Sequence, residues 1–235
     1  MVFKFKKFEV NQAQCTMKVN TDGVLLGALA TADPANDILD VGTGTGVIAL
    51  MLAQRFGQAA IDAIEIDTES AQTAIKNFEN SVFYNRIQGY SNSFQEFFKA
   101  KPEKKYDLIV SNPPFFINAL ESVSLSKKLS RHTNENFFEN FLQQTAAHLA
   151  PTGALWLILP LATENLTQSI GLSYHLAVQK RISIHSFPHV KPHRVIVKMG
   201  FQQMDLIFDK LVIYEQEKQY TKTYQGLLRD FLTIF

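Results

Sequence analysis

The stretch that decides the fold is Ile38-Leu39-Asp40-Val41-Gly42-Thr43-Gly44-Thr45-Gly46. An apolar run enters it, three glycines alternate with small residues, and apolar positions at helical spacing follow as far as Gly57. This pattern predicts a buried strand, a tight turn and a helix. Glycine can adopt positive φ and lets the backbone approach a ligand closely, and the helix N-terminus offers free N–H groups to a polar or anionic ligand.

The glycine spacing and one carboxylate indicate the kind of ligand. The motif is G-x-G-x-G rather than the G-x-G-x-x-G of dinucleotide sites, and Asp40 stands two residues before the first glycine. A pyrophosphate has no need of a carboxylate there, whereas a cofactor with a positively charged amino-acid end tolerates one well. The loop therefore favours S-adenosylmethionine (SAM) over NAD, although a glycine-rich turn alone is a weak signal.

The composition limits the class of protein. The 235 residues suffice for one α/β domain, and 46% hydrophobic with 19% charged residues is ordinary for a globular protein. The net charge is +1, so any nucleic-acid surface must be local. The single cysteine, Cys15, excludes an intrachain disulfide and fits a reducing cytoplasm. The sequence has no signal-peptide pattern and no bilayer-length apolar run, so we expect a cytoplasmic protein with no membrane association.

The chain before the glycine loop is expected to form a strand and a cap segment over residues 1–32, ahead of a core over residues 33–235. Residues 1–10 alternate aromatic and charged side chains, which is a strand pattern. Residues 24–30 predict a short helix capped by Thr21 or Asp22. Whether this helix covers a ligand pocket or is only a capped helix stays open.

The next strand supplies a candidate ribose ligand. Residues 60–67 predict a second parallel strand that ends in carboxylates about 20 residues after the glycine loop. Glu65 is the better candidate for the ribose hydroxyls, because Asp67 is placed to cap a helix over residues 70–77. A third strand is expected at residues 86–88. No acid stands at Ser93 in the following loop, so we expect the adenine ring to contact backbone there.

A second decisive segment is Ser111-Asn112-Pro113-Pro114-Phe115-Phe116, which follows a buried strand at residues 108–110. The prolines fix the backbone and remove two N–H donors, so the segment presents carbonyl groups, and a residue before proline is held extended. The Asn112 side-chain oxygen and the Pro113 carbonyl then form a rigid pair of acceptors beside Phe115. Such a pair suits a planar nitrogen that carries two hydrogens.

Together these motifs resemble class I SAM-dependent methyltransferases that act on amino groups. The segments Met17-Lys18-Val19-Asn20-Thr21-Asp22-Gly23 and Arg131-His132-Thr133 narrow the resemblance to the bacterial tRNA1(Val) adenine-37 N6-methyltransferase family, almost end to end. The chain departs from the family pattern at Asn20, where glycine is more usual, and around Ser93.

The resemblance implies an α/β fold, a Rossmann-like doubly wound sheet of seven mostly parallel strands with a C-terminal antiparallel hairpin. The hairpin would be formed by residues 176–185 and 194–201. Further strands are expected at residues 153–160 and 206–214, and helices at residues 137–149 and 220–235.

The resemblance also implies the residues of the site. The catalytic residues are expected to be Asn112, Pro113, Pro114 and Phe115. SAM is expected to contact Lys18, Thr21, Asp22, Asp40, Gly42, Thr43, Gly44, Gly46, Glu65, Ile66, Ser93 and Asn112. The RNA is expected to contact Phe115, Phe116, Lys127, Lys128, Arg131, His132, Lys191 and Arg194.

Two surface segments underlie the RNA assignment. Residues 117–130 are expected to form a polar loop beside the acceptor pair that holds RNA phosphates, although a plain solvated loop is equally consistent with its two lysines. Arg181 and His193 would join Lys191 and Arg194 in a second basic patch. His189 and His193 have a metal-like spacing but no third ligand, so we expect no metal.

The expected reaction is methyl transfer from SAM to the exocyclic N6 amine of adenine in the anticodon stem-loop of a tRNA, by a monomeric enzyme. Adenine-37 as the target rests on the family resemblance alone. The alternatives are a protein-glutamine N5-methyltransferase acting on release factors, which would present an amide to the same acceptors, a DNA adenine methyltransferase and a non-catalytic RNA-binding protein. The first usually carries tyrosine where this chain has Phe115 and has a larger N-terminal domain. The second lacks an obvious target-recognition domain here.

Overall fold

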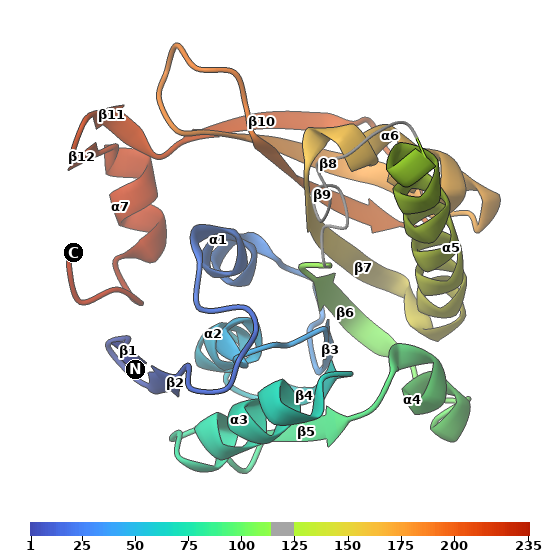
Figure 1. The fold of residues 1–235 in the computed structure, drawn as a ribbon, viewed down its shortest axis with the longest axis horizontal. Coiled ribbons are helices and arrows are strands. Elements are labelled where there is room, and N and C mark those ends of the chain that lie inside the picture. Colours follow the sequence, from blue (N-terminus) through green and yellow to red (C-terminus); the bar gives the residue numbers. More distant parts are fainter. Residues whose placement is uncertain (114–124) are drawn as a thin grey trace.

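The computed structural model describes the backbone of residues 1–113 and 125–235, and the side chains of residues 1–113 and 135–235. Within these residues an eight-stranded sheet runs in the order β10-β8-β9-β7-β6-β3-β4-β5 (Figure 1). Its strands are β3 (Asp37–Val41), β4 (Ala60–Glu65), β5 (Ile87–Ser91), β6 (Tyr106–Ser111), β7 (Leu149–Leu159), β8 (Ala177–His185), β9 (Arg194–Gly200) and β10 (Ile207–Val212). The expected doubly wound sheet is confirmed, with one strand more than the seven expected.

The strand directions follow the prediction. The five strands β5, β4, β3, β6 and β7 are mutually parallel. Strand β9 is antiparallel to both β7 and β8, which confirms the C-terminal hairpin, and β10 adds to β8 in the parallel sense. The strand order reverses between β3 and β6, and ligands of such sheets bind beyond the carboxyl ends of the strands at this point.

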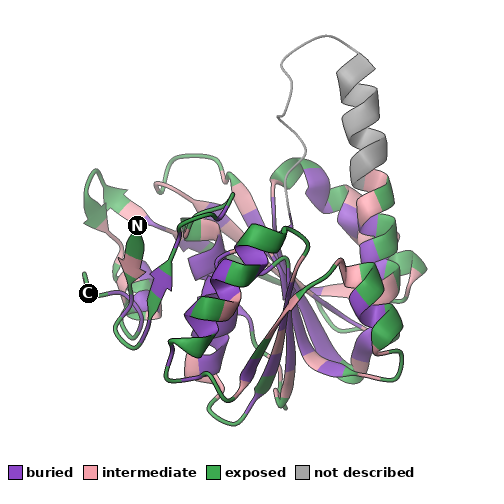
Figure 2. Cartoon of the chain, turned by 60° about the horizontal axis from the view of Figure 1, so that its bottom comes forward, coloured by how far each residue is buried: buried purple, intermediate pink, exposed green. Residues whose placement is uncertain are grey.

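Helices cover both faces of the sheet (Figure 1). One face carries α1 (Thr21–Leu29), α2 (Val47–Arg55), α3 (Thr68–Glu79) and α7 (Lys222–Leu228), and the other carries α4 (Phe94–Ala100), α5 (Leu125–His148) and α6 (Leu161–Ser173). Successive strand residues point to opposite faces, so neighbours such as Ile38 and Leu39 enter different cores. Figure 2 shows the buried strands between the two helical layers. None of the described helices is both long and apolar enough to cross a bilayer.

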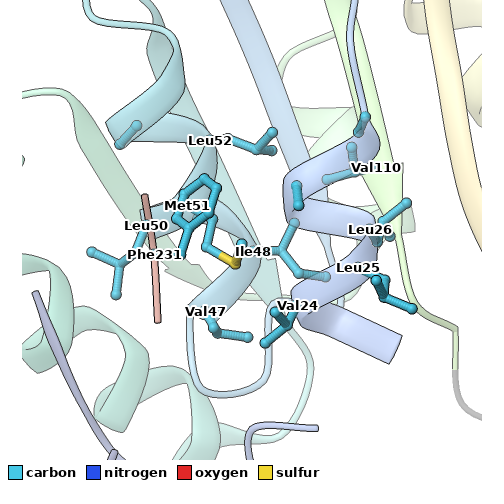
Figure 3. Packing of buried hydrophobic residues seen from close by; sticks show 14 of the residues in the cluster. Val24, Leu25, Leu26, Val47, Ile48, Leu50, Met51, Leu52, Val110 and Phe231 are labelled. Atoms are coloured by element: carbon cyan, nitrogen blue, oxygen red, sulfur yellow. The ribbon is translucent and has the colours of Figure 1, made fainter. Parts of the chain in front are cut away.

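The helix before the glycine loop packs closely on the helix after it (Figure 3). Leu25 and Leu26 of α1 and Met51 of α2 are fully buried between the two helices and the sheet. A Cβ atom at Gly27 would lie 3.0 Å from the Met51 side chain, so the close approach of α1 and α2 requires a small residue there. This packing holds α1 beside α2, the helix that follows the glycine loop.

Short strands lie outside the main sheet. They are β1 (Val2–Lys4) paired with β2 (Glu9–Asn11), and β11 (Tyr214–Gln216) paired with β12 (Gln219–Tyr220). Asn77 on α3 attaches β2 to the glycine loop: its amide exchanges two hydrogen bonds of 2.9 Å with the Asn11 backbone and donates a third, also 2.9 Å, to the Thr45 carbonyl. The N-terminal segment is thereby held against the loop.

Three expected elements differ in the structure. Helix α5 begins at Leu125, so residues 125–130 are helical rather than part of a loop, and the helix expected from residue 137 is its second half. Leucine and lysine are good helix formers, and the polarity of the lysines and serines alone gave the wrong prediction. Helix α1 is capped by Asn20, not by Thr21 or Asp22, and the terminal helix covers only Lys222–Leu228.

Candidate active site

A cavity of about 460 Å³ lies at the carboxyl ends of β3, β4, β5 and β6, where the strand order reverses. Its walls come from the glycine loop, the ends of these strands and the segment before α1. The residues that line it include Thr16, Met17, Lys18, Asn20, Gly42, Thr43, Gly44, Glu65, Ile66, Ser93, Phe94, Ser111, Asn112 and Phe137. Its size is within the range of about 300–1,000 Å³ of small-molecule sites.

The glycine loop presents bare backbone to this cavity. Gly42, Gly44 and Gly46 have φ values of 74°, 56° and 84°, a left-handed conformation that favours glycine. A Cβ atom added at Gly42 or Gly44 would meet no atom within 4 Å, because both residues face the open cavity. At Gly46 it would lie 2.4 Å from the Phe78 ring, so this third glycine serves packing instead.

Glu65 is fixed at the end of β4 by backbone donors. Its Oε2 accepts a hydrogen bond of 2.9 Å from Gly44 N, and its Oε1 accepts one of 3.0 Å from Asp67 N. The carboxylate still has acceptor capacity toward the cavity, as a ribose-binding acid requires. The next residue, Ile66, is 72% exposed although apolar and lines the same cavity, where it offers a flat apolar wall.

Asp40 lies beneath the glycine loop instead of facing the cavity. Its side chain is fully buried, and its Oδ2 accepts hydrogen bonds from the Thr43 hydroxyl at 2.6 Å and from Ala49 N at 3.2 Å. Burial raises the pKa of Asp40 to about 7, against the opposing effect of these two hydrogen bonds. Asp40 is not among the residues that line the cavity, and its Oδ2 holds the loop to the start of α2, so contact of Asp40 with the charged end of the cofactor stays a prediction.

Asn112 follows β6 directly and lines the cavity. The Ser111 hydroxyl donates to the Val41 carbonyl over 2.8 Å, which fixes the end of β6 against β3. The Asn112 Nδ2 atom lies 4.0 Å from the Met17 sulfur. Its Oδ1 atom is buried and has no hydrogen-bond partner among the residues whose side chains are described. A buried acceptor without a partner costs free energy, so this oxygen is placed to receive a donor from a bound molecule.

Comparisons with known proteins agree with this geometry. Residues 18–169 match the family model "Methyltransferase small domain". A tRNA1(Val) (adenine(37)-N6)-methyltransferase of Pedobacter heparinus is 44% identical over 99% of this chain and 98% of its own length. The chain belongs to this methyltransferase family. A Haemophilus influenzae relative with the same name is 38% identical over 99% of both chains.

Solved structures show the same fold at lower sequence identity. The crystal structure of a predicted O-methyltransferase from Agrobacterium tumefaciens superposes with a TM-score of 0.71 at 20% identity, and covers 89% of this chain and 96% of its own. The TYW2 protein of P. horikoshii, in complex with MeSAdo, gives a TM-score of 0.57 at 13% identity over 86% of this chain and 70% of its own. The methyltransferase family and the fold together imply that this chain uses SAM.

The cavity fits SAM on the residues present. Open space faces Gly42 and Gly44, the fixed carboxylate of Glu65 lies beside it, and apolar walls come from Ile66 and Phe94. Ser93 lines the cavity, but its hydroxyl is committed to capping α4, where it bonds Glu96 at 2.8 Å. Contact of adenine with the Ser93 backbone therefore stays a prediction for this methyltransferase.

Of the other residues expected to bind the cofactor, some line the cavity and others do not. Lys18 lines the cavity, whereas Thr21 and Asp22 do not. Asp22 instead accepts a 2.8 Å hydrogen bond from the Arg194 guanidinium in an ion pair. The two residues bind each other, so contact of Asp22 with SAM and of Arg194 with RNA stays a prediction.

The predicted RNA ligands are only partly described. Pro114, Phe115 and Phe116 lie outside the described residues. Lys127, Lys128, Arg131 and His132 lie on α5, and their side chains are likewise outside the described part. Lys191 is exposed, as expected. Arg181 does not join it, because its guanidinium pairs with Glu164 at 2.5 and 2.9 Å. The described residues contain no cluster of three or more potential metal ligands.

Several residues that line the cavity of this methyltransferase were not expected to from the sequence, among them Met17, Asn20, Phe94 and Phe137. Phe94 directly follows Ser93, so its place after the third strand was a usable signal. Phe137 comes from α5 and meets Phe94 edge-on at 5.9 Å, a contact between residues far apart in the sequence. Local patterns could not have predicted that contact.

Proposed function

We propose that this chain transfers a methyl group from SAM to the exocyclic N6 amine of adenine-37 in tRNA1(Val). The observation that carries the proposal is the buried Oδ1 of Asn112, an acceptor in the cavity wall without a partner among the described side chains. The family's printed name supplies the nucleotide and the tRNA, which the acceptor chemistry alone would not distinguish from other amino-group substrates.

Bound SAM supplies an electrophilic methyl group on a sulfonium. We propose that Gly42 and Gly44 give its amino-acid part room along the loop, that Glu65 accepts hydrogen bonds from its ribose, and that Ile66 packs on its adenine. Lys18 also lines the cavity, and we propose that its ammonium approaches the carboxylate of SAM. Each role follows from the position of the residue on the cavity wall.

Asn112 and Pro113 act on the substrate amine. The N6 amine is a weak nucleophile because its lone pair is delocalised into the ring. Hydrogen bonds from its two hydrogens to Asn112 Oδ1 and the Pro113 carbonyl favour a pyramidal nitrogen whose lone pair faces the methyl group. As the N–C bond forms and the S–C bond breaks, nitrogen becomes positively charged, and the same two oxygens stabilise it. The proton is released to solvent afterwards, so no base is needed before attack.

The RNA must deliver its adenine into the cavity. A base reaches such a site only when it leaves its stack, and a loop purine costs less to extrude than one in a duplex. We propose that Phe115 stacks on the extruded base, that Phe116 and the cations of α5 contact the adjoining RNA, and that a monomer acts on tRNA in the cytoplasm.

The test uses labelled SAM with total tRNA, release factor and duplex DNA in parallel, followed by nucleoside analysis. We expect label in tRNA as N6-methyladenosine, and loss of it when adenine-37 of the tRNA1(Val) transcript is replaced by guanine. Label in the release factor would identify glutamine as the substrate, and label in DNA would identify adenine in duplex DNA as the substrate. Absence of label in all three would reject methyl transfer.

A further inference from the structure

The connection between β8 and β9, residues 186–193, lies at the same edge of the sheet as the cavity. It follows the end of β8 and precedes Arg194, whose ion pair with Asp22 joins β9 to the start of α1. Gly23, which follows Asp22, and Asn20, two residues before it, line the cavity. In Figure 1 this connection is the orange loop that extends at the upper left, above α1. It therefore adjoins the wall of the site.

The connection is held in one shape by its own hydrogen bonds. The carbonyl of Val190 lies 2.7 Å from His185 Nδ1, and that of Pro188 accepts from Lys210 Nζ at 3.2 Å. His193 N donates to the Ile184 carbonyl at 3.1 Å. Two prolines restrict the backbone further. This surface is already ordered in the folded protein, so a partner that binds here does not incur the conformational-entropy cost of ordering it.

The chemistry of this surface is aromatic and basic. The Phe187 ring stacks on His189 with centroids 6.1 Å apart and planes at 21°, and its centroid lies 5.6 Å from that of the Tyr214 ring. His189 and Lys191 are exposed at the tip. The eight residues contain no aspartate or glutamate. Exposed rings beside cations, without acids, are the composition that binds single-stranded nucleic acid by stacking and phosphate contact.

We propose that this connection is a platform for single-stranded RNA, on which a nucleotide flanking the extruded adenine stacks on His189 while Lys191 contacts its phosphate. The inference rests on the proposed function and extends it: the cavity takes the target base, and the platform takes its neighbour in the loop. A second protein chain is the less favoured occupant, because an exposed cationic tip supplies little of the apolar area that a protein interface buries at its centre.

The test measures the affinity of the full chain for the anticodon stem-loop RNA of tRNA1(Val) over a series of salt concentrations. The variants are His189→Ala, His189→Phe and Lys191→Ala, and the matched control is Lys99→Ala, an exposed lysine in the last turn of α4. We expect His189→Ala to weaken binding about tenfold and His189→Phe to restore it, as a stacking contact requires. Lys191→Ala should lower the slope of log K against log salt by about 0.7–0.9, and Lys99→Ala should leave it unchanged.

Thermal unfolding and SAM affinity of each variant, measured in parallel, establish that the fold and the cofactor site are intact. If the wild-type chain methylates tRNA1(Val) and both His189→Ala and Lys191→Ala bind RNA as Lys99→Ala does, the platform is rejected and the proposed function stands. If the wild-type chain neither binds the stem-loop nor methylates tRNA, both are rejected. Preferential binding of a protein to the wild-type chain over His189→Ala, without any change in RNA affinity, would assign the surface to a protein partner and also reject the platform.

Discussion

The backbone N–H of Gly44 donates a hydrogen bond of 2.9 Å to Oε2 of Glu65, which links the centre of the glycine loop to the end of β4. The same carboxylate accepts from Asp67 N through its other oxygen. Two backbone donors thus fix the carboxylate before any ligand arrives, and the loop and the Glu65 carboxylate become one rigid unit. Such preorganisation reduces the ordering cost of binding.

Changes at Glu65 should therefore weaken SAM binding in two steps. Glu65→Gln keeps the shape but replaces one acceptor by an N–H₂ group that faces the Asp67 N–H, so we expect SAM affinity to fall about tenfold. Glu65→Ala removes both the link to the loop and the acceptor, and hydrogen bonds to charged groups contribute about 1.5–3 kcal/mol, so affinity should fall about 100-fold. Calorimetry measures both, with the exposed Glu103→Gln as the control. Wild-type affinity in Glu65→Ala would contradict the assignment.

The glycines of the loop should respond differently to alanine. Gly44→Ala adds a methyl group that meets no protein atom within 4 Å but enters the cavity, so we expect a stability loss of about 1–2 kcal/mol from the positive φ and at least a tenfold loss of SAM affinity. Gly46→Ala places its methyl group 2.4 Å from the buried Phe78 ring, so about 3 kcal/mol or more of stability should be lost. Urea unfolding and SAM titration of both variants test this contrast, and equal stability losses would refute it.

Local patterns predicted most of the fold and part of the site. The strands β3, β4, β6 and β7 are rich in apolar residues, and the three glycines of the loop have positive φ, so both features were visible in the sequence. The ion pair of Asp22 with Arg194 joins residues 172 positions apart, and no local pattern contains it. Asp40 had the expected residue type, but whether its side chain faced the cavity or the core depended on how α2 packs.

Removal of the Asn112 side chain should separate chemistry from cofactor binding. Asn112→Ala deletes one of the two acceptors that we propose stabilise the developing charge, and loss of one such group costs about 10²–10³ in kcat. SAM affinity should stay within about twofold of wild type, because Glu65 and the loop remain. Single-turnover methylation of the tRNA1(Val) transcript and SAM calorimetry measure the two effects. Asn140→Ala, on the exposed side of α5, is the matched control. Near-normal turnover in Asn112→Ala would remove Asn112 from the mechanism.

Asp40 should give the free enzyme an unusual dependence of stability on pH. Burial raises the pKa of Asp40 from 3.8 to about 7, so the folded chain binds more protons than the unfolded chain between these values. The contribution of Asp40 is therefore fully present below about pH 4 and is lost as pH rises through about 7. The difference between the two pKa values corresponds to at most about 4 kcal/mol.

The variant Asp40→Asn isolates this effect because its amide oxygen can still accept from Thr43 and Ala49 but does not titrate. Carboxyl groups with lowered pKa, such as Asp67 and Glu96, oppose the trend but are common to both proteins and cancel in the difference. Between about pH 5 and pH 8, urea unfolding should show the wild type losing stability relative to Asp40→Asn. Parallel curves would contradict the prediction. They would mean that Asp40 ionises as readily in the folded chain as in the unfolded one, despite its burial beneath the loop.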